Sequence, residues 1–133
     1  MKAAKGSFEV KANFEPPFEA VDGVSLGRAT FDKRFGGELE GTSQVWMLAA
    51  RGPVQNSAGY VAIERVTGSL DGRKGSFVLQ HSGVADRGKN SLDVTVVPDS
   101  GTGELSGLRG KMTIEIVDGR HLYAFDYELV ENP

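Results

Sequence analysis

Alternating apolar and polar residues, interrupted by glycine-containing turns, run through the whole chain. Between Phe8 and Phe14, every second residue is apolar and the residues between them are polar. Successive side chains of a β-strand point to opposite faces, so this spacing is typical of a strand with one buried face. The 18 glycines are spread along the 133 residues and lie mostly at turns. No segment has helical periodicity over a helical length, and the sequence therefore predicts an all-β protein.

Turn residues divide the chain into short strands. The predicted strands, which share the period-two pattern, cover residues 6–14, 26–35, 38–50, 59–70, 75–83, 91–97, 111–117 and 121–130. Asp71-Gly72 and Asp118-Gly119 supply the positive φ angles of tight hairpin turns, and Gly36-Gly37 also predicts a hairpin. The glycine-rich segment 100–110 is expected to form a short strand or an ordered loop.

The number and spacing of these strands restrict the architecture. Roughly eight strands joined by short turns allow a barrel or a sandwich. The first and last strands both look able to pair, and closure removes exposed sheet edges, so we expect a closed antiparallel barrel. The length of 133 residues fits one domain over residues 1–133. The interior of a barrel of about eight strands is either filled by side chains or has room for one small ligand.

Composition excludes several classes of function. The net charge of −3 argues against non-specific nucleic-acid binding, which needs a basic surface. The absence of cysteine rules out disulfides and thiolate chemistry. Residues 1–6 contain no apolar stretch of a secretion signal, and no run approaches the ~20 apolar residues of a membrane span. We therefore expect a cytoplasmic protein without membrane or nucleic-acid partners.

Three segments carry a family resemblance: Gly59–Gly68, Gly75–Gly83 and Gly101–Gly110. Together they resemble a family of small bacterial proteins of unknown function with an allene oxide cyclase-like barrel, and the match runs from about Gly6 to Leu129. The resemblance implies an eight-stranded antiparallel barrel related in shape to plant allene oxide cyclases and dirigent proteins. Those relatives bind hydrophobic substrates in the barrel and steer ring closure. No catalytic residue of the plant enzymes maps onto this sequence.

His81 and Glu64 are the candidate catalytic residues. His81 lies within a predicted strand and is one of two histidines. Its imidazole either transfers protons near neutral pH or is simply hydrogen-bonded in the barrel wall. His121 adjoins a turn and is expected at the surface. An inward Glu64 would have a raised pKa and could act as a general acid or base. Isolated carboxylates are rarely buried, which favours an outward Glu64.

Candidate ligand-binding residues come from several predicted strands. Glu40, Thr42, Gln44 and Trp46 alternate along one strand face, which is either a pocket lining or an exposed surface. Gln80 and His81 are neighbours in a strand, so they point in opposite directions. The full candidate set is Gln44, Trp46, Tyr60, Glu64, Phe77, Gln80, His81, Tyr123 and Phe125.

Three hypotheses for function remain open. The first is a barrel that binds a small hydrophobic or aromatic molecule, lined by residues such as Trp46, Phe77, Tyr123 and Phe125. The second is a cofactor-independent isomerase or cyclase, and the residues do not decide whether the protein is an enzyme. The third is a structural or interaction protein that forms a homo-oligomer, a dimer or trimer. The two histidines are far apart in sequence, which argues against a zinc site. The Gly-x-Ser-x-Gly motif of the usual hydrolases is missing, and no cofactor is expected.

Overall fold

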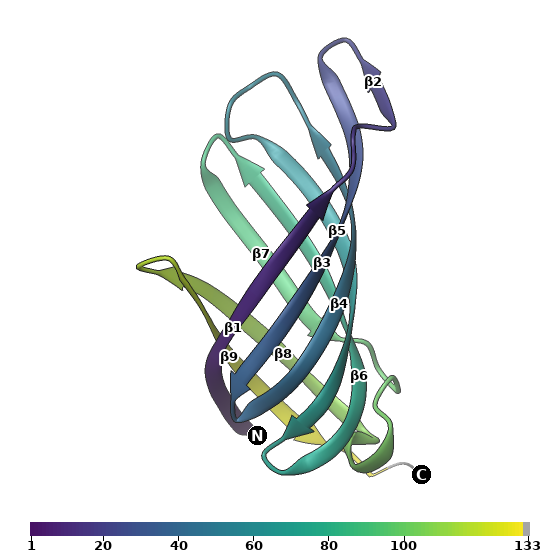
Figure 1. Cartoon of the computed structure of the whole chain (residues 1–133), viewed down its shortest axis with the longest axis vertical. Coiled ribbons are helices and arrows are strands. Elements are labelled where there is room, and N and C mark those ends of the chain that lie inside the picture. Colours follow the sequence, from purple (N-terminus) through teal and green to yellow (C-terminus); the bar gives the residue numbers. More distant parts are fainter. Residues whose placement is uncertain (132–133) are drawn as a thin grey trace.

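The strands close into an antiparallel barrel (Figure 1). The computed structural model describes residues 1–131. The sheet has the strand order β1-β9-β8-β7-β6-β5-β4-β3-β2, and an additional pairing of β1 with β3 closes the ring. The elements are β1 (Lys2–Phe14), β2 (Glu19–Val21), β3 (Val24–Gly37), β4 (Leu39–Arg51), β5 (Ala58–Leu70), β6 (Arg73–Asp86), β7 (Lys89–Val96), η1 (Gly103–Leu105), β8 (Leu108–Val117) and β9 (Arg120–Leu129).

The predicted all-β closed barrel of eight antiparallel strands is confirmed. Both residues of Asp71-Gly72 and of Asp118-Gly119 have positive φ, as tight hairpins between twisted strands require. The short strand β2 lies in a predicted loop and extends the sheet by pairing with the start of β3. The glycine-rich segment contains the 3₁₀ turn η1, so its first part is an ordered loop, and β8 starts at Leu108.

One end of the barrel is filled by a packed core. Its largest fully buried side chains are Tyr127, Phe35, Phe77, Phe125, Leu39, Leu70, Leu79, Leu105 and Leu108. The Phe77 and Phe125 rings stack with their centroids 5.8 Å apart. The Tyr123 hydroxyl accepts a hydrogen bond from the backbone N–H of Leu39 at 2.9 Å, which ties β9 to the start of β4 across the core. Buried side chains therefore fill this end of the barrel.

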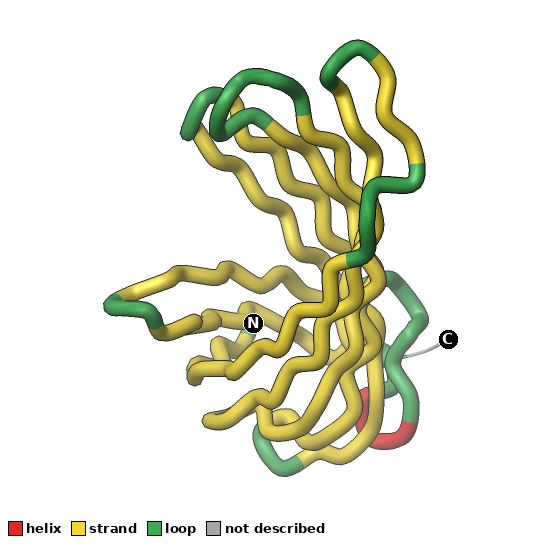
Figure 2. Tube along the Cα trace, turned by 45° about the horizontal axis from the view of Figure 1, so that its top comes forward, coloured by secondary structure: helices red, strands yellow, loops and turns green. Residues whose placement is uncertain are grey.

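The other end is open, because β7 and β8 separate (Figures 1 and 2). The two strands pair only at Val94–Met112 and Thr95–Lys111, so the β8–β9 hairpin diverges from the β6–β7 hairpin. Inward-facing apolar side chains are therefore exposed here: Phe14 is 70% exposed, Ile116 67% and Leu92 41%. The barrel thus combines a solid apolar half with a half whose inner surface meets solvent.

Candidate binding site inside the barrel

Four neighbouring strands place one polar side chain each in the barrel interior. Lys33 in β3 is the direct cross-strand partner of Ser43 in β4. Glu64 in β5 lies diagonally across from Ser43, and His81 in β6 lies diagonally across from Glu64. Diagonal partners on one sheet face are within reach of long side chains. The register of the barrel therefore assembles a polar cluster, Lys33, Ser43, Glu64 and His81, from positions far apart in sequence.

Glu64 is the centre of this polar cluster. Its Oε1 accepts hydrogen bonds from His81 Nε2 at 2.7 Å and from Lys33 Nζ at 3.2 Å. Its Oε2 accepts a hydrogen bond from Ser43 Oγ at 2.5 Å. The carboxylate has no solvent exposure, so these three donors replace its lost hydration. The expected outward orientation of Glu64 is wrong, because the sequence did not reveal that donors on three other strands surround it.

The partners of Glu64 also reverse the expected direction of its pKa shift. Burial raises the pKa of this carboxyl, as the sequence predicted for an inward position. The His81 hydrogen bond, the positive charge of Lys33 and the Ser43 hydrogen bond lower it, and together they outweigh burial. The pKa of Glu64 is therefore below its ordinary value, and the group is ionised at neutral pH.

The Lys33 ammonium is held by an aromatic ring as well as by Glu64. Its Nζ lies 4.6 Å from the centroid of the Phe8 ring, a distance at which a cation is attracted to the ring face. The Phe8 ring also lies against His121, and the two ring centroids are 5.1 Å apart. His121 is thus half-buried on the inward face of β9, and its predicted surface position is wrong, because β9 pairs with β1 and turns this face toward Phe8.

His81 lies at the border between the two halves of the barrel, and its side chain is 5% exposed. Within residues 1–131, every buried side-chain nitrogen or oxygen atom has a hydrogen-bond partner. The ring bonds to Glu64 through Nε2, which leaves Nδ1 as the nitrogen that contacts solvent. Tyr60 lies beyond it toward the open end, with its ring against Gly83 of β6. Burial and the nearby negative charge of Glu64 raise the pKa of this phenol.

Three of the predicted lining residues lie outside the barrel. On β4, Leu39, Ser43 and Val45 face the interior and are buried, so Gln44 and Trp46 face outward. Gln80 faces outward for the same reason, because its neighbour His81 faces inward. The prediction that Trp46 lines the interior is wrong. Because both faces of β4 contain apolar residues, only closure of the barrel decides which face of the strand is inside.

The other predicted lining residues divide between the two halves of the interior. Phe77, Tyr123 and Phe125 are inside, but they belong to the buried apolar core of the closed end. Tyr60, Glu64 and His81 are brought together at the border of the open half. Tyr60, Glu64 and His81 therefore define the candidate site, at the level where β7 and β8 separate.

Sequence reasoning missed Lys33 and Ser43. Lys33 interrupts an apolar strand face formed by Ala29, Phe31 and Phe35, and a charge at such a position is a signal that the sequence does contain. Ser43 similarly precedes Val45 on the inward face of β4. A polar residue within an otherwise apolar face could have indicated a buried partner.

Two features are absent from residues 1–131. No group of three or more His, Cys, Asp or Glu side chains in this part of the chain is placed to hold a metal ion. No helix in it is long and apolar enough to cross a bilayer.

The fold and the interior cluster define a class of small antiparallel β-barrels with one solid end and one open end. Within that class the chain belongs to a family described as "Protein of unknown function (DUF3224)", whose pattern matches residues 4–127. The chain is similar to a DUF3224 protein of unknown function from Shewanella oneidensis MR-1, known from a crystal structure. The two are 50% identical, with a TM-score of 0.93, over 98% of this chain and 99% of that chain. A comparison with curated proteins gave no match.

Proposed function

We propose that this protein binds a small apolar or aromatic molecule in the open half of its barrel, with His81 as the polar contact. The observation that carries the proposal is the buried hydrogen bond between His81 and Glu64 at the border of that half. Val94, the β7 partner of His81, is where β7 begins to pair with β8. The proposal assigns Nδ1 of His81 to the ligand, at the level where strand separation exposes the inner surface of the barrel.

A purely structural role explains the polar cluster less well than a binding role. Replacing a buried ion pair by apolar residues is often neutral or stabilising, so such pairs are weak devices for stability. A buried titratable pair beside exposed apolar side chains is instead a typical feature of binding sites. The exposed inward-facing Phe14, Leu92 and Ile116 supply that apolar surface.

The polar cluster also indicates the chemistry of the ligand. The charges of Glu64 and Lys33 balance each other, so the site has no unmatched charge to attract an ion. When Nε2–H of His81 donates to ionised Glu64, Nδ1 of the neutral ring is an acceptor. The Tyr60 ring adds an aromatic surface next to it. A neutral, mainly apolar molecule with one hydroxyl group fits these features.

A second candidate function is a cofactor-independent isomerase or cyclase acting at the same place. It is favoured by the orientation of His81, because a carboxylate that holds an imidazole prepares it as a general base. Nδ1 would take a proton from the ligand, Glu64 would stabilise the imidazolium, and the same proton would return at another atom. Ser43 donates to Glu64 and not to His81, so His81 does not activate the Ser43 hydroxyl. The proposed kinship with allene oxide cyclase-like barrels points the same way.

A binding screen tests the proposal. Native mass spectrometry and thermal shifts would be measured with medium-chain alcohols, phenols and fatty acids. We expect phenols or alcohols to bind and raise the melting temperature, and His81→Gln to weaken this effect at least about tenfold in affinity. Gln80→Ala is the matched control, because this neighbouring side chain faces outward. A lack of binding across the panel, or equal binding by His81→Gln, would contradict the proposal.

The outer surface of the barrel supports the third hypothesis, a homo-oligomer. Leu48, Val61, Ile63 and Val84 are exposed and lie on the outward faces of the adjacent strands β4, β5 and β6. Contiguous exposed apolar patches often mark protein interfaces. Light scattering of the purified protein would decide between a monomer and an oligomer.

A further inference from the structure

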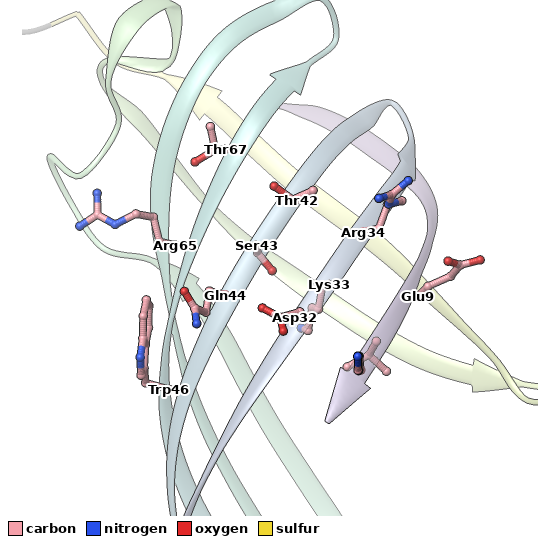
Figure 3. Close-up of a pocket in the computed structure, with 12 residues that line it drawn as sticks. Glu9, Asp32, Lys33, Arg34, Thr42, Ser43, Gln44, Trp46, Arg65 and Thr67 are labelled. Atoms are coloured by element: carbon pink, nitrogen blue, oxygen red, sulfur yellow. The ribbon is translucent and has the colours of Figure 1, made fainter. Parts of the chain in front are cut away.

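A groove of about 600 Å³ crosses the outer face of β1, β3, β4 and β5, on the other side of the barrel wall from the polar cluster (Figure 3). Its lining is mostly polar, with one large aromatic side chain. Its lining includes Lys11, Asp32, Arg34, Gln44, Trp46 and Arg65. Figure 3 shows Gln44 between Trp46 and Asp32.

The strand register arranges these side chains in a row. Asp32, Gln44 and Arg65 are direct partners across β3, β4 and β5, so they point outward from the same line of the sheet. Adjacent strands are about 4.8 Å apart, which spaces an acceptor, an amide and a guanidinium evenly along the groove. Trp46 follows two residues after Gln44 on the same strand face, so its indole stands at one side of this row.

The polar groups of this row are available to a ligand. Within residues 1–131, the ion pairs within 4.0 Å are Lys33–Glu64, His81–Glu64 and Arg109–Asp99, and none includes Asp32 or Arg65. Gln44 is exposed, and the Trp46 side chain is 48% exposed, which is high for the largest apolar residue. The groove thus offers hydrogen-bond donors, acceptors and a flat aromatic face together.

We propose that this outer groove binds a saccharide. A pyranose ring has an apolar C–H face, which matches the flat indole of Trp46, and a rim of hydroxyls, each both donor and acceptor. Asp32 would accept from these hydroxyls, Arg65 would donate to them, and Gln44 would do both. An anion fits less well, because Glu9 and Asp32 line the same groove as the cations Lys11, Arg34 and Arg65, and each carboxylate has a cation as its direct cross-strand partner on β1 or β3. An apolar ligand would leave the polar row unpaired.

This inference goes beyond the proposed function, and the two can fail separately. The groove faces outward, whereas His81 faces the interior. His81→Gln is therefore expected to leave saccharide binding unchanged, and Gln44→Ala to leave the binding of phenols or alcohols unchanged.

All indole signals come from the single tryptophan, Trp46, which lines this groove and also the neighbouring outer pocket that contains Gln80. Cellobiose, maltose, lactose and xylobiose would be titrated to about 10 mM, which detects dissociation constants in the millimolar range. At least one disaccharide should change the tryptophan fluorescence and shift the indole N–H resonance. No response of either signal to any of the four sugars would overturn the proposal.

Matched variants locate the site. Gln44→Ala and Asp32→Ala should each weaken binding at least about tenfold, while Gln80→Ala should not. Gln80 is a suitable control because it is exposed, faces outward and lines the neighbouring pocket that shares Trp46, but does not line this groove. Sugar binding that survives both groove substitutions would also overturn the assignment.

Discussion

The buried charge of Glu64 leads to a quantitative prediction. Glu64→Gln keeps the size of the side chain but removes its charge, and it leaves the Lys33 ammonium in the barrel interior without a counterion. Removing one partner of a buried ion pair typically costs about 3–5 kcal/mol of folding free energy. We expect the free energy of unfolding to fall by about 3 kcal/mol, the lower end of that range.

The lower end follows from the surroundings of Lys33. Its side chain retains 9% exposure, so the ammonium keeps some contact with water. The Phe8 ring, 4.6 Å away, continues to stabilise the cation. The amide oxygen that replaces the carboxylate can still accept the Ser43 hydrogen bond. Each of these features reduces the cost of the lost charge.

A double-mutant cycle measured by urea denaturation tests this reasoning. Lys33→Met alone should lower the free energy of unfolding by about 2 kcal/mol, because Glu64 keeps its hydrogen bonds to Ser43 and His81. The double variant should also lose about 2 kcal/mol, since neither charge is then left unpaired. The coupling free energy between the two sites would be about 3 kcal/mol.

Two results would refute the reasoning. Losses that simply add, with a coupling below about 0.5 kcal/mol, would mean that Lys33 and Glu64 do not act as a buried pair. A Glu64→Gln variant as stable as the parent protein would mean that the carboxylate is solvated. The slope of the denaturation curve serves as the control, because an unchanged slope shows that the folded state is intact.

Three further predictions concern pH and packing. Because the pKa of Glu64 is lowered, its contribution to the free energy of unfolding is present above pH 4.5 and is lost as the pH falls through the pKa of the folded state. Glu64→Gln should therefore flatten the acid limb of a profile of stability against pH. Burial raises the pKa of all three tyrosines. For Tyr127, burial together with the Asp71 hydrogen bond raises the pKa to about 12. The folded protein should therefore show little phenolate absorbance at pH 10.0, and Tyr127 should contribute stability that is lost as the pH rises through about 12. Gly68→Ala should lower the free energy of unfolding by about 1–3 kcal/mol in urea denaturation, because a Cβ there would lie 2.1 Å from a β4 carbonyl oxygen. Gly52→Ala should be nearly neutral, because a Cβ at this position would stand in open space.

Much of the fold could be predicted from local patterns. The Asp71-Gly72 turn places β5 against β6, and Asp118-Gly119 places β8 against β9, because both dipeptides adopt the positive φ angles of tight hairpins. The strand β2 could not be predicted, since three residues are too few to show alternation. Its pairing with β3 depends on the position of the neighbouring strand.

The candidate site could be predicted only in part. Alternation placed Glu64 on the same face as Ala62 and Val66, and both of these are buried, but the rarity of buried carboxylates favoured the opposite orientation. That rule does not apply when several donors surround the carboxylate. Lys33 is 31 residues from Glu64 in sequence, and no local pattern connects them.

The sequence by itself determined which side chains share a strand face and where the chain turns, because both depend on neighbouring residues. Only the tertiary structure decided which face is inside. Curling of the sheet and the pairing of β1 with β3 turned Ser43 inward and Trp46 outward, although both lie on β4. The same closure brought Lys33, Glu64 and His81 together, since contacts between distant strands depend on register and curvature over the whole sheet.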